Sequence, residues 1–332
     1  MAERPIRLAL NGFGRIGRTL LRQLLRDGEG FDLVCVNDIV APELCAYLFQ
    51  YDSVFGPFPG AVEAQDDALV VDGRRLPFHR AERLDQLDLS GVDIVLECTG
   101  RATTPEIAAE GLRAGAGRVL ISGPSPAADL TVVLGANEER LAGQSIVSNA
   151  SCTTNALAPL LRLLDDIWGV ESGHMTTVHC YTGSQPTVDK PRDTPERSRA
   201  AALSMVPTTT SAGRLIGEVL PHLAGRVEAR AMRVPTASVS AIDLTVMTRD
   251  PVTAELVNAR LRDAAATSPV FGWIEAPLVS TDLRGRPESL IVSGPETSVS
   301  SGGLLRLFGW YDNEWGFSCR MLDMARLMMG RS

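Results

Sequence analysis

Lysine is almost absent from this sequence: Lys190 is the only one among 332 residues, and the other basic residues are arginines. Schiff-base chemistry through lysine would therefore have to use that one side chain. The six cysteines include no CxxC pair, which argues against a structural zinc site or a disulfide framework and fits a reducing compartment. A formal net charge of −8 argues against general nucleic-acid binding. Because neither a signal peptide nor a membrane-length apolar run is recognisable, we expect a cytoplasmic protein with no membrane or nucleic-acid partner.

The N-terminal segment is predicted to form a strand–helix–strand unit with a glycine-rich turn. Ile6–Leu10 and Phe31–Val36 have the apolar character of strands, and leucines recur at helical spacing between them. The turn before the helix carries glycines at Gly12, Gly14 and Gly17. Such glycines allow a tight turn, a close approach of the backbone to a pyrophosphate, and close packing of the helix on the strand. The segment therefore predicts a dinucleotide site.

An acidic residue after the second strand favours NAD over NADP. Asp38 stands about 20 residues after Gly17, which is the usual spacing for a carboxylate that binds the ribose hydroxyls. Its negative charge would repel the 2′-phosphate of NADP. We therefore expect NAD as the cofactor, and we expect no metal site.

The two halves of the chain differ in their strand pattern. The first half alternates short strands with helices and includes a hairpin at Asp72-Gly73; its further strands are predicted at Val92–Leu96, Arg118–Ile121, Leu130–Leu134 and Ile146–Ser148. The second half has longer strands without that alternation, predicted at Met175–Val178, Val227–Val234, Ser238–Thr248 and Leu304–Trp310. We expect an α/β protein with two domains. Residues 1–151 are expected to form a Rossmann doubly wound NAD-binding domain, on which the C-terminal helix 318–332 packs back. Residues 152–317 form an α+β catalytic domain with a mixed or antiparallel sheet.

One cysteine stands at the start of a predicted helix and is the candidate nucleophile. Cys152 lies between the hydroxyl residues Ser151 and Thr153, and leucines recur at helical spacing from Leu157 onward. Free backbone N–H groups and the positive end of the helix dipole would face the sulfur. Such a setting favours the thiolate, which is the reactive form.

A histidine after a predicted strand is the candidate proton acceptor. His179 follows Met175–Val178, whereas the other three histidines are expected to be structural or at the surface. Paired with Cys152, His179 could take the thiol proton and later move protons at a carbonyl oxygen.

At these residues the chain resembles the phosphorylating glyceraldehyde-3-phosphate dehydrogenase family, almost from end to end. The motifs that carry the resemblance are Asn11–Arg18, Tyr51–Val54, Ser148–Asn155, Thr176–His179, Pro207–Thr210, Met232–Thr236 and Trp310–Glu314. The resemblance implies an NAD-dependent oxidoreductase of glycolysis that forms an acyl phosphate through a thioester on Cys152, activated by His179.

The resemblance also implies binding residues. Beyond the three glycines, contacts to NAD would come from Arg15, Ile16, Asp38, Arg83, Thr99, Ser122 and Asn313, of which Asn313 would hold the nicotinamide amide. The aldose phosphate would be bound by Thr182 and Arg233. Inorganic phosphate would be bound by Ser151, Thr153, Arg197, Thr210 and Ser211. Arginine and hydroxyl donors suit phosphate oxygens, which arginine can bind through two bonds.

The sequence departs from the family at positions that would touch substrate, and two alternatives stay open. Gly183-Ser184 replace the usual Asn-Asp, and Ser211 replaces a glycine whose N–H can meet phosphate. Leu163–Asp166, Val170–Gly173 and Ala241–Leu244 look like the related erythrose-4-phosphate dehydrogenases, whereas Thr182 and Pro207–Thr210 look like the glyceraldehyde-3-phosphate group. A non-catalytic, NAD-binding or redox-sensing relative would be expected to lack Cys152, His179 or Arg233. The loop Tyr181–Arg199 crosses to a neighbouring subunit in this family, which implies a homotetramer.

Overall fold

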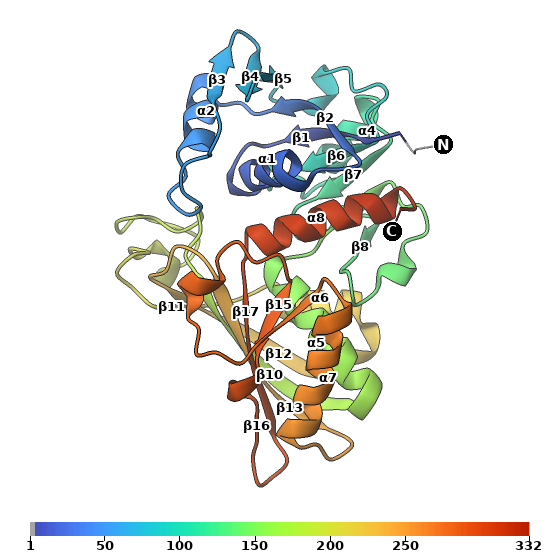
Figure 1. The fold of residues 1–332 in the computed structure, drawn as a ribbon, viewed down its shortest axis with the longest axis vertical. Helices are drawn as coiled ribbons and strands as arrows, with labels where there is room; N and C mark the ends of the chain where they lie inside the picture. The colour runs from blue at the N-terminus through green and yellow to red at the C-terminus, as the bar shows by residue number, and fades with distance from the viewer. Residues whose placement is uncertain (1–3, 332) are drawn as a thin grey trace. The chain divides into compact units, whose positions relative to one another are not determined.

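The computed structural model describes residues 4–331, which fold into two compact units. The first unit runs to Val132, takes in Glu139–Ala150 and resumes at Ser318. The second comprises Val133–Glu138 and Ser151–Phe317. Helices and strands are labelled in Figure 1.

The first unit is built on a nine-stranded sheet in the order β3-β4-β5-β2-β1-β6-β7-β9-β8. The strands from β5 to β8 in this order pair in parallel, and β3, β4 and β5 form an antiparallel meander at one edge. Their bounds are β1 Ile6–Asn11, β2 Phe31–Asn37, β3 Val62–Gln65, β4 Ala68–Val71, β5 Arg74–His79, β6 Ile94–Glu97, β7 Arg118–Ile121, β8 Leu130–Thr131 and β9 Ile146–Ser148. The strand order reverses between β1 and β6, which is where parallel sheets of this kind bind ligands.

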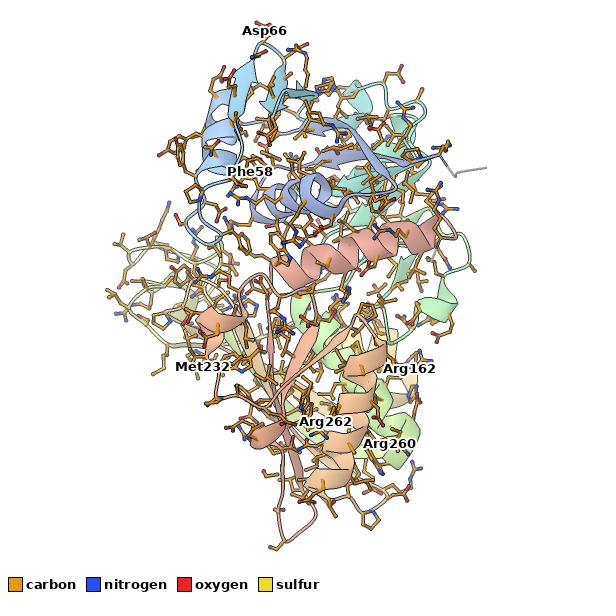
Figure 2. The ribbon with its side chains drawn as sticks, viewed as in Figure 1. Phe58, Asp66, Arg162, Met232, Arg260 and Arg262 are labelled. Atoms are coloured by element: carbon orange, nitrogen blue, oxygen red, sulfur yellow. The ribbon has the colours of Figure 1, made fainter. Side chains whose placement is uncertain are left out.

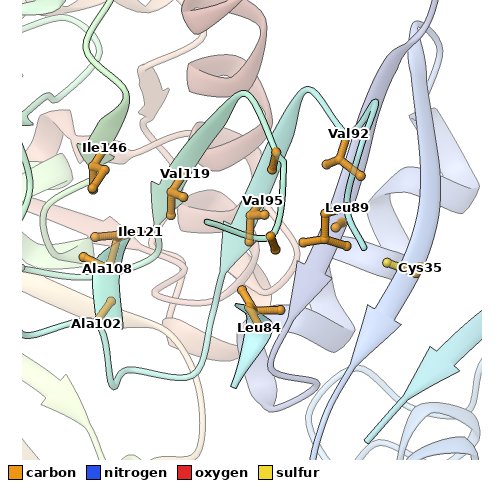
Figure 3. Packing of buried hydrophobic residues seen from close by; sticks show 13 residues of the cluster. Cys35, Leu84, Leu89, Val92, Val95, Ala102, Ala108, Val119, Ile121 and Ile146 are labelled. Carbon is orange, nitrogen blue, oxygen red and sulfur yellow. The ribbon is translucent and has the colours of Figure 1, made fainter. Parts of the chain in front are cut away.

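Helices and a buried apolar cluster complete this unit. The helices are α1 Arg15–Asp27, α2 Pro42–Gln50, α3 Pro105–Ala108 and α4 Glu110–Arg113, together with most of α8 Trp315–Met328. Figure 3 shows the cluster on one side of the sheet, where Val95, Val119 and Ile121 pack with Ala108 of α3. The doubly wound prediction is confirmed.

Local details of this unit follow the sequence, with shifts at strand ends: the strand predicted over Val92–Leu96 is β6, Ile94–Glu97. The hairpin is confirmed: Asp72 and Gly73 have φ of 49° and 79°, as a two-residue turn of this hand requires. The strand predicted over Leu130–Leu134 ends at Thr131, because the Val133 N–H donates to the Asn137 side chain at 2.8 Å instead of continuing the ladder. Thr104 precedes α3, and its side chain makes no capping hydrogen bond to that short helix.

The second unit contains a mixed eight-stranded sheet. Its order is β11-β12-β10-β13-β17-β15-β14, with β16 paired to β17. The bounds are β10 Val170–Cys180, β11 Val206–Thr208, β12 Val227–Val234, β13 Ser240–Thr248, β14 Phe271–Ile274, β15 Leu290–Ser293, β16 Ser298–Val299 and β17 Leu305–Tyr311. Only the pairs β10–β12 and β14–β15 are parallel, which confirms the mixed-sheet prediction.

Three helices accompany this sheet: α5 Cys152–Trp168, α6 Ala212–Val219 and α7 Ala254–Thr267. Helix α5 buries Leu157, Leu160 and Leu161 and packs against β10 and β13. The Ser151 side chain accepts a hydrogen bond from the Thr154 N–H at 3.1 Å and so caps the helix. The first turn of α5 is thereby fixed beside the end of β10, which places the cysteine.

Several surface arginines form ion pairs with acidic residues. Arg262 of α7 forms an ion pair with Glu275, with 2.7 Å between Nη2 and Oε1. Arg162 of α5 forms another with Asp166, with 3.6 Å between Nε and Oδ2; both arginines are labelled in Figure 2. Within residues 4–331, no helix is long and apolar enough to cross a membrane. The same residues contain no cluster of three or more His, Cys, Asp or Glu side chains that could hold a metal ion.

Candidate active site

The first unit has a cavity of about 300 Å³ where β1, β2 and β6 end. Gly12, Gly14 and Asp38 line it, as does Thr99. Gly12 has φ of 92°, and a Cβ there would lie 2.8 Å from the Thr99 nitrogen. A Cβ on Gly17 would meet the Gly12 carbonyl oxygen at 2.1 Å, whereas Gly14 faces open space. The glycine-rich turn is thus shaped for a ligand to approach its backbone, as a dinucleotide requires.

Two backbone N–H groups hold the Asp38 carboxylate at the edge of this cavity. Its Oδ2 accepts from the Phe13 N–H at 2.6 Å and its Oδ1 from the Val40 N–H at 2.9 Å. Each carboxylate oxygen has lone pairs left after these bonds, so Asp38 can also accept from two ribose hydroxyls.

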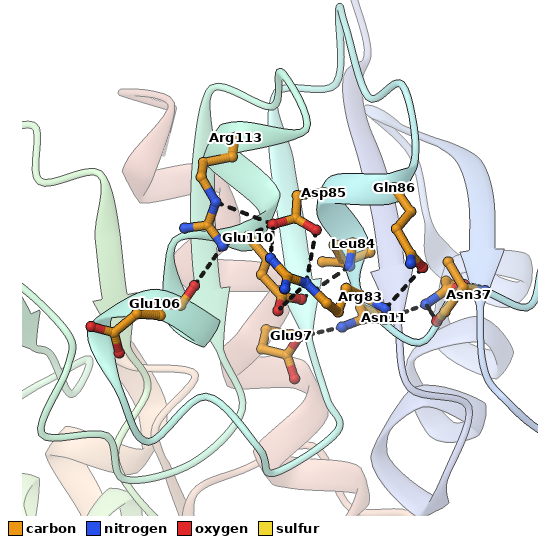
Figure 4. Close-up of polar contacts among 11 residues, drawn as sticks. Asn11, Asn37, Arg83, Leu84, Asp85, Gln86, Glu97, Glu106, Glu110 and Arg113 are labelled. Atoms are coloured by element: carbon orange, nitrogen blue, oxygen red, sulfur yellow. Dashed lines mark hydrogen bonds and ion pairs between the residues drawn. The ribbon is translucent and has the colours of Figure 1, made fainter.

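A buried polar network underlies the cavity, and sequence reasoning missed it. Asn11 donates to the Glu97 carboxylate, and Asn37 donates to Asn11 at 2.8 Å (Figure 4). The Glu97 carboxylate also accepts from the Thr99 N–H at 2.8 Å. Burial raises the pKa of Glu97, and its hydrogen bonds to Thr99 and Asn11 oppose that rise. The sequence signal for this network is the acidic residue Glu97 at the end of the apolar strand β6.

The other expected coenzyme residues of this unit lie in different settings. Arg15 forms an ion pair with Asp52, Ile16 is half-buried in α1, and the Ser122 N–H donates to the Glu97 carbonyl at 2.9 Å. Arg83 forms an ion pair with Asp85 at 2.5 Å and is not among the residues that line the cavity (Figure 4).

Arg80 contacts the segment that follows Asp38. Its Nη2 donates to the Ile39 carbonyl at 3.2 Å, directly after Asp38, and the following Ala81 and Glu82 line the cavity. Arg80 therefore places a positive charge near Asp38, the residue expected to bind the ribose.

In the second unit, the structure brings the cysteine and the histidine together. Cys152 Sγ lies 3.6 Å from His179 Nε2, where α5 begins and β10 ends. Cys152 keeps partial access to solvent. Ala150, two residues earlier, has φ of 56°, a conformation that non-glycine residues rarely adopt and that tends to occur near functional sites.

Burial and nearby charges act on both members of this pair. Burial raises the pKa of the Cys152 thiol, and the Arg233 charge and hydrogen bonds to Thr153 oppose that rise. Burial, followed by the charge of Arg233, lowers the pKa of His179 from 6.5 to about 4. At neutral pH a neutral imidazole therefore faces a protonated thiol, which is the starting state for general-base activation.

The other side of the imidazole contacts a carbonyl and a guanidinium. His179 Nδ1 lies 2.7 Å from the Cys180 carbonyl oxygen and 2.8 Å from Arg233 Nη1. When Nδ1 carries the proton it can donate to the carbonyl, which leaves Nε2 to accept from the thiol; when it does not, it can accept from Arg233. Either tautomer has a partner, as suits a group that takes and returns a proton.

A buried tyrosine supports this arrangement and had no role in the sequence analysis beyond its motif. Tyr311 Oη is 2.9 Å from Thr153 Oγ1 and 2.8 Å from Thr177 Oγ1, and its ring lies edge-to-face with His179 at 6.0 Å. These contacts tie the first turn of α5 to β10 and so maintain the separation of thiol and imidazole.

The residues expected to bind phosphates are only partly brought together. Arg197 Nε donates to Thr208 Oγ1 at 2.7 Å, and the two line a cavity of about 600 Å³. Thr210 accepts from the Ala212 N–H at 3.2 Å, and Ser211 precedes α6 without a side-chain capping bond. Thr182 pairs with Ser184 at 2.9 Å, whereas Arg233 contacts His179 and the Cys180 carbonyl.

Comparison with known proteins shows which family the chain belongs to. Residues 6–105 match the family profile described as glyceraldehyde 3-phosphate dehydrogenase, NAD binding domain, and residues 151–313 match the corresponding C-terminal domain. The chain belongs to the glyceraldehyde-3-phosphate dehydrogenase family. It is 48% identical over 325 residues to the glyceraldehyde-3-phosphate dehydrogenase of Pseudomonas aeruginosa, covering 96% of this chain and 97% of that protein. It is 45% identical over 331 residues to that of Xanthobacter flavus, covering 97% of this chain and 98% of the relative.

Proposed function

We propose that this protein oxidises glyceraldehyde-3-phosphate with NAD and inorganic phosphate to 1,3-bisphosphoglycerate. The observation that carries the proposal is the contact between Cys152 Sγ and His179 Nε2 at 3.6 Å. The cavity above the glycine-rich turn fits the coenzyme, since its glycines and Asp38 provide backbone room and ribose acceptors. Cys152, His179 and Arg233 are all present, which disfavours a non-catalytic relative.

The reaction begins with removal of the proton from the Cys152 thiol. His179 accepts the thiol proton, and the Cys152 thiolate attacks the aldehyde carbon to give a hemithioacetal. The Cys152 N–H and the protonated Nε2 of His179 stabilise the oxyanion that forms. When bound, NAD serves as the hydride acceptor. Oxidation leaves a thioester on Cys152, and attack by inorganic phosphate releases the acyl phosphate and regenerates the thiolate.

Parallel steady-state kinetics on two aldose phosphates test the substrate assignment. Glyceraldehyde-3-phosphate is expected to give the higher kcat/KM with NAD and phosphate. A higher kcat/KM for erythrose-4-phosphate would move the assignment to that activity, with the same thiol chemistry.

Asp38→Ala is expected to narrow the preference for NAD over NADP. The carboxylate accepts from ribose hydroxyls and repels a 2′-phosphate, and losing a charge-assisted hydrogen bond weakens binding by about 1.5–3 kcal/mol. The kcat/KM for NAD should fall roughly ten- to hundredfold while that for NADP falls less or rises. Asp66→Ala, an exposed turn residue of the same unit, is the matched control. Equal kcat/KM for both coenzymes in the parent protein would contradict the role of Asp38.

Removing single arginines is expected to separate the two phosphate roles. Arg197→Ala should raise KM for inorganic phosphate roughly ten- to hundredfold, since a charge-assisted contact contributes about 1.5–3 kcal/mol. Arg233→Ala should raise KM for the aldose phosphate more than KM for NAD. Because Arg233 also contacts His179, its loss should lower kcat as well. Arg260→Ala, at an exposed arginine of α7, serves as control; KM values that change equally for all substrates in both variants would refute these assignments.

The proposed assembly is a cytoplasmic homotetramer. The loop Tyr181–Arg199 and the residues after it expose apolar side chains: Val188 is 72%, Leu203 84% and Met205 72% exposed. Apolar groups this exposed on neighbouring segments favour burial against another subunit. Light scattering on the active protein should give four times the chain mass of 35.6 kDa, and a stable, fully active monomer would refute the assembly.

A further inference from the structure

Three neighbouring strands of the first unit end in amide or carboxyl side chains that form one row across the sheet. Asn37 ends β2, Asn11 ends β1 and Glu97 ends β6. Asn11 is paired with Asn37 on one side and with Glu97 on the other, so the three side chains leave the sheet on the same face. Each residue is at most 7% exposed, and all three line the cavity at the ends of these strands.

The backbone of Ala81 sets the direction of the hydrogen bonds in this row. Asn37 Oδ1 accepts from the Ala81 N–H at 2.9 Å, and Asn37 Nδ2 donates to the Ala81 carbonyl at 3.1 Å. Because a backbone N–H can only donate and a carbonyl can only accept, these two bonds allow one orientation of the Asn37 amide. Asn37 Nδ2 also donates to Asn11 Oδ1 at 2.8 Å, which turns the Asn11 NH₂ group toward Glu97.

Glu97 receives hydrogen-bond donors at both of its oxygens. Asn11 Nδ2 donates to Oε2, whereas the Thr99 N–H at 2.8 Å and the Thr99 hydroxyl both donate to Oε1. The Thr99 oxygen accepts from the Arg101 N–H at 3.1 Å, so its own hydrogen is available for Glu97. A carboxylate accepts at both oxygens, whereas an amide at this position would place its NH₂ group against one of these donors.

The row joins three segments that line the cavity. Ala81 lies shortly after β5, Gly12 directly follows Asn11, and Thr99 lies shortly after β6. A Cβ on Gly12 would lie 2.8 Å from the Thr99 nitrogen, so a shift of Thr99 would change the space at the glycine-rich turn. We infer, on the basis of the proposed NAD-dependent function, that Glu97 is a positioning residue. As a carboxylate it fixes the direction of the amide row, and so holds these three segments at the spacing that the coenzyme needs.

Exchanging the carboxylate and the amide between positions 11 and 97 tests this inference. Glu97→Gln places an NH₂ group against a donor, and Asn11→Asp places two carboxylates against each other. Each single variant should therefore weaken NAD binding, measured by calorimetry, by at least about tenfold. In the double variant Asn11→Asp/Glu97→Gln, the carboxylate at position 11 can accept from Asn37 and from the amide at position 97, whose oxygen can accept from Thr99. It should bind NAD within about threefold of the parent, a strongly non-additive result.

The controls separate positioning from a loss of stability. Thermal unfolding without NAD is recorded for each variant, and calorimetry is performed below the transition, where a purely structural role would leave the affinity of the folded protein unchanged. KM for NAD should rise in the single variants, whereas kcat at saturating NAD and the alkylation rate of Cys152 should not change. Glu63→Gln, at an exposed glutamate of β3, is the matched control and should bind NAD as the parent does.

Two results would overturn the inference: parent-like NAD affinity in Glu97→Gln, or a double variant that binds NAD no better than Asn11→Asp. The second comparison decides alone if Glu97→Gln does not fold. A parent protein that binds NAD but does not oxidise the aldose phosphate would overturn the proposed function and leave this inference in place. A parent protein that does not bind NAD would overturn both.

Discussion

Cys152→Ser is expected to lower the turnover of glyceraldehyde-3-phosphate by at least about 10³-fold, because a serine hydroxyl is a far poorer nucleophile than a thiolate. The substitution removes the only sulfur in contact with His179 Nε2 among the described residues. Serine is close in size to cysteine, and Cys152 is only partly buried, so folding should be preserved. NAD affinity should also be nearly unchanged, since Cys152 is not among the residues that line the expected coenzyme cavity.

Calorimetric NAD binding and a thermal unfolding curve are the controls for that variant. Cys319→Ser, at another partly exposed cysteine, provides a matched thiol loss outside the site and should keep full turnover. Turnover of Cys152→Ser within tenfold of the parent would rule out the covalent mechanism.

His179→Asn is expected to lower turnover by roughly 10²–10⁴-fold, the usual contribution of a general base. Burial raises the pKa of the Cys152 thiol, so without the imidazole little thiolate forms at neutral pH. The rate of alkylation by iodoacetamide should therefore fall near neutral pH and recover only at higher pH. His222→Asn, at an exposed histidine of the 3-10 helix Pro221–Leu223, is the control.

The same variant should change the pH dependence of stability. The pKa of His179 is lowered from 6.5 to about 4 in the folded state, so between these values the unfolded state binds the proton more readily. The imidazole thus makes the parent protein less stable as pH falls from 6.5 toward 4, and stability is unaffected by this group above 6.5. His179→Asn should flatten that decline in the free energy of unfolding. An unchanged alkylation profile together with an unchanged pH dependence of unfolding would remove His179 from the activating role.

The fold was predictable from the sequence where short-range patterns determine it. The Gly12–Gly17 turn, the hairpin at Asp72-Gly73 and the capped helix at Cys152 each depend on a few neighbouring residues, and all three are present in the structure. The strand ending at Thr131 was overestimated, because the side chain that ends it comes from Asn137 in the following loop.

The chemistry of the site was predictable only as far as residue identity. The sequence indicated that Cys152 and His179 would pair, but the thiol pKa also depends on burial and on Arg233, which no local pattern relates to Cys152. Asn313, which follows β17, contacts Cys180 of β10 and Ser240 of β13, and no local pattern relates these strands to β17. Contacts of this kind require the folded chain.

Mass spectrometry of the acyl-enzyme tests the central claim most directly. The protein is incubated with glyceraldehyde-3-phosphate and NAD without phosphate, quenched in acid and digested. The account predicts a phosphoglyceroyl group on the peptide that contains Cys152, and its loss with formation of acyl phosphate when inorganic phosphate is added before the quench. Formation of NADH with no acyl group on Cys152, or with the acyl group on another residue, would contradict the account.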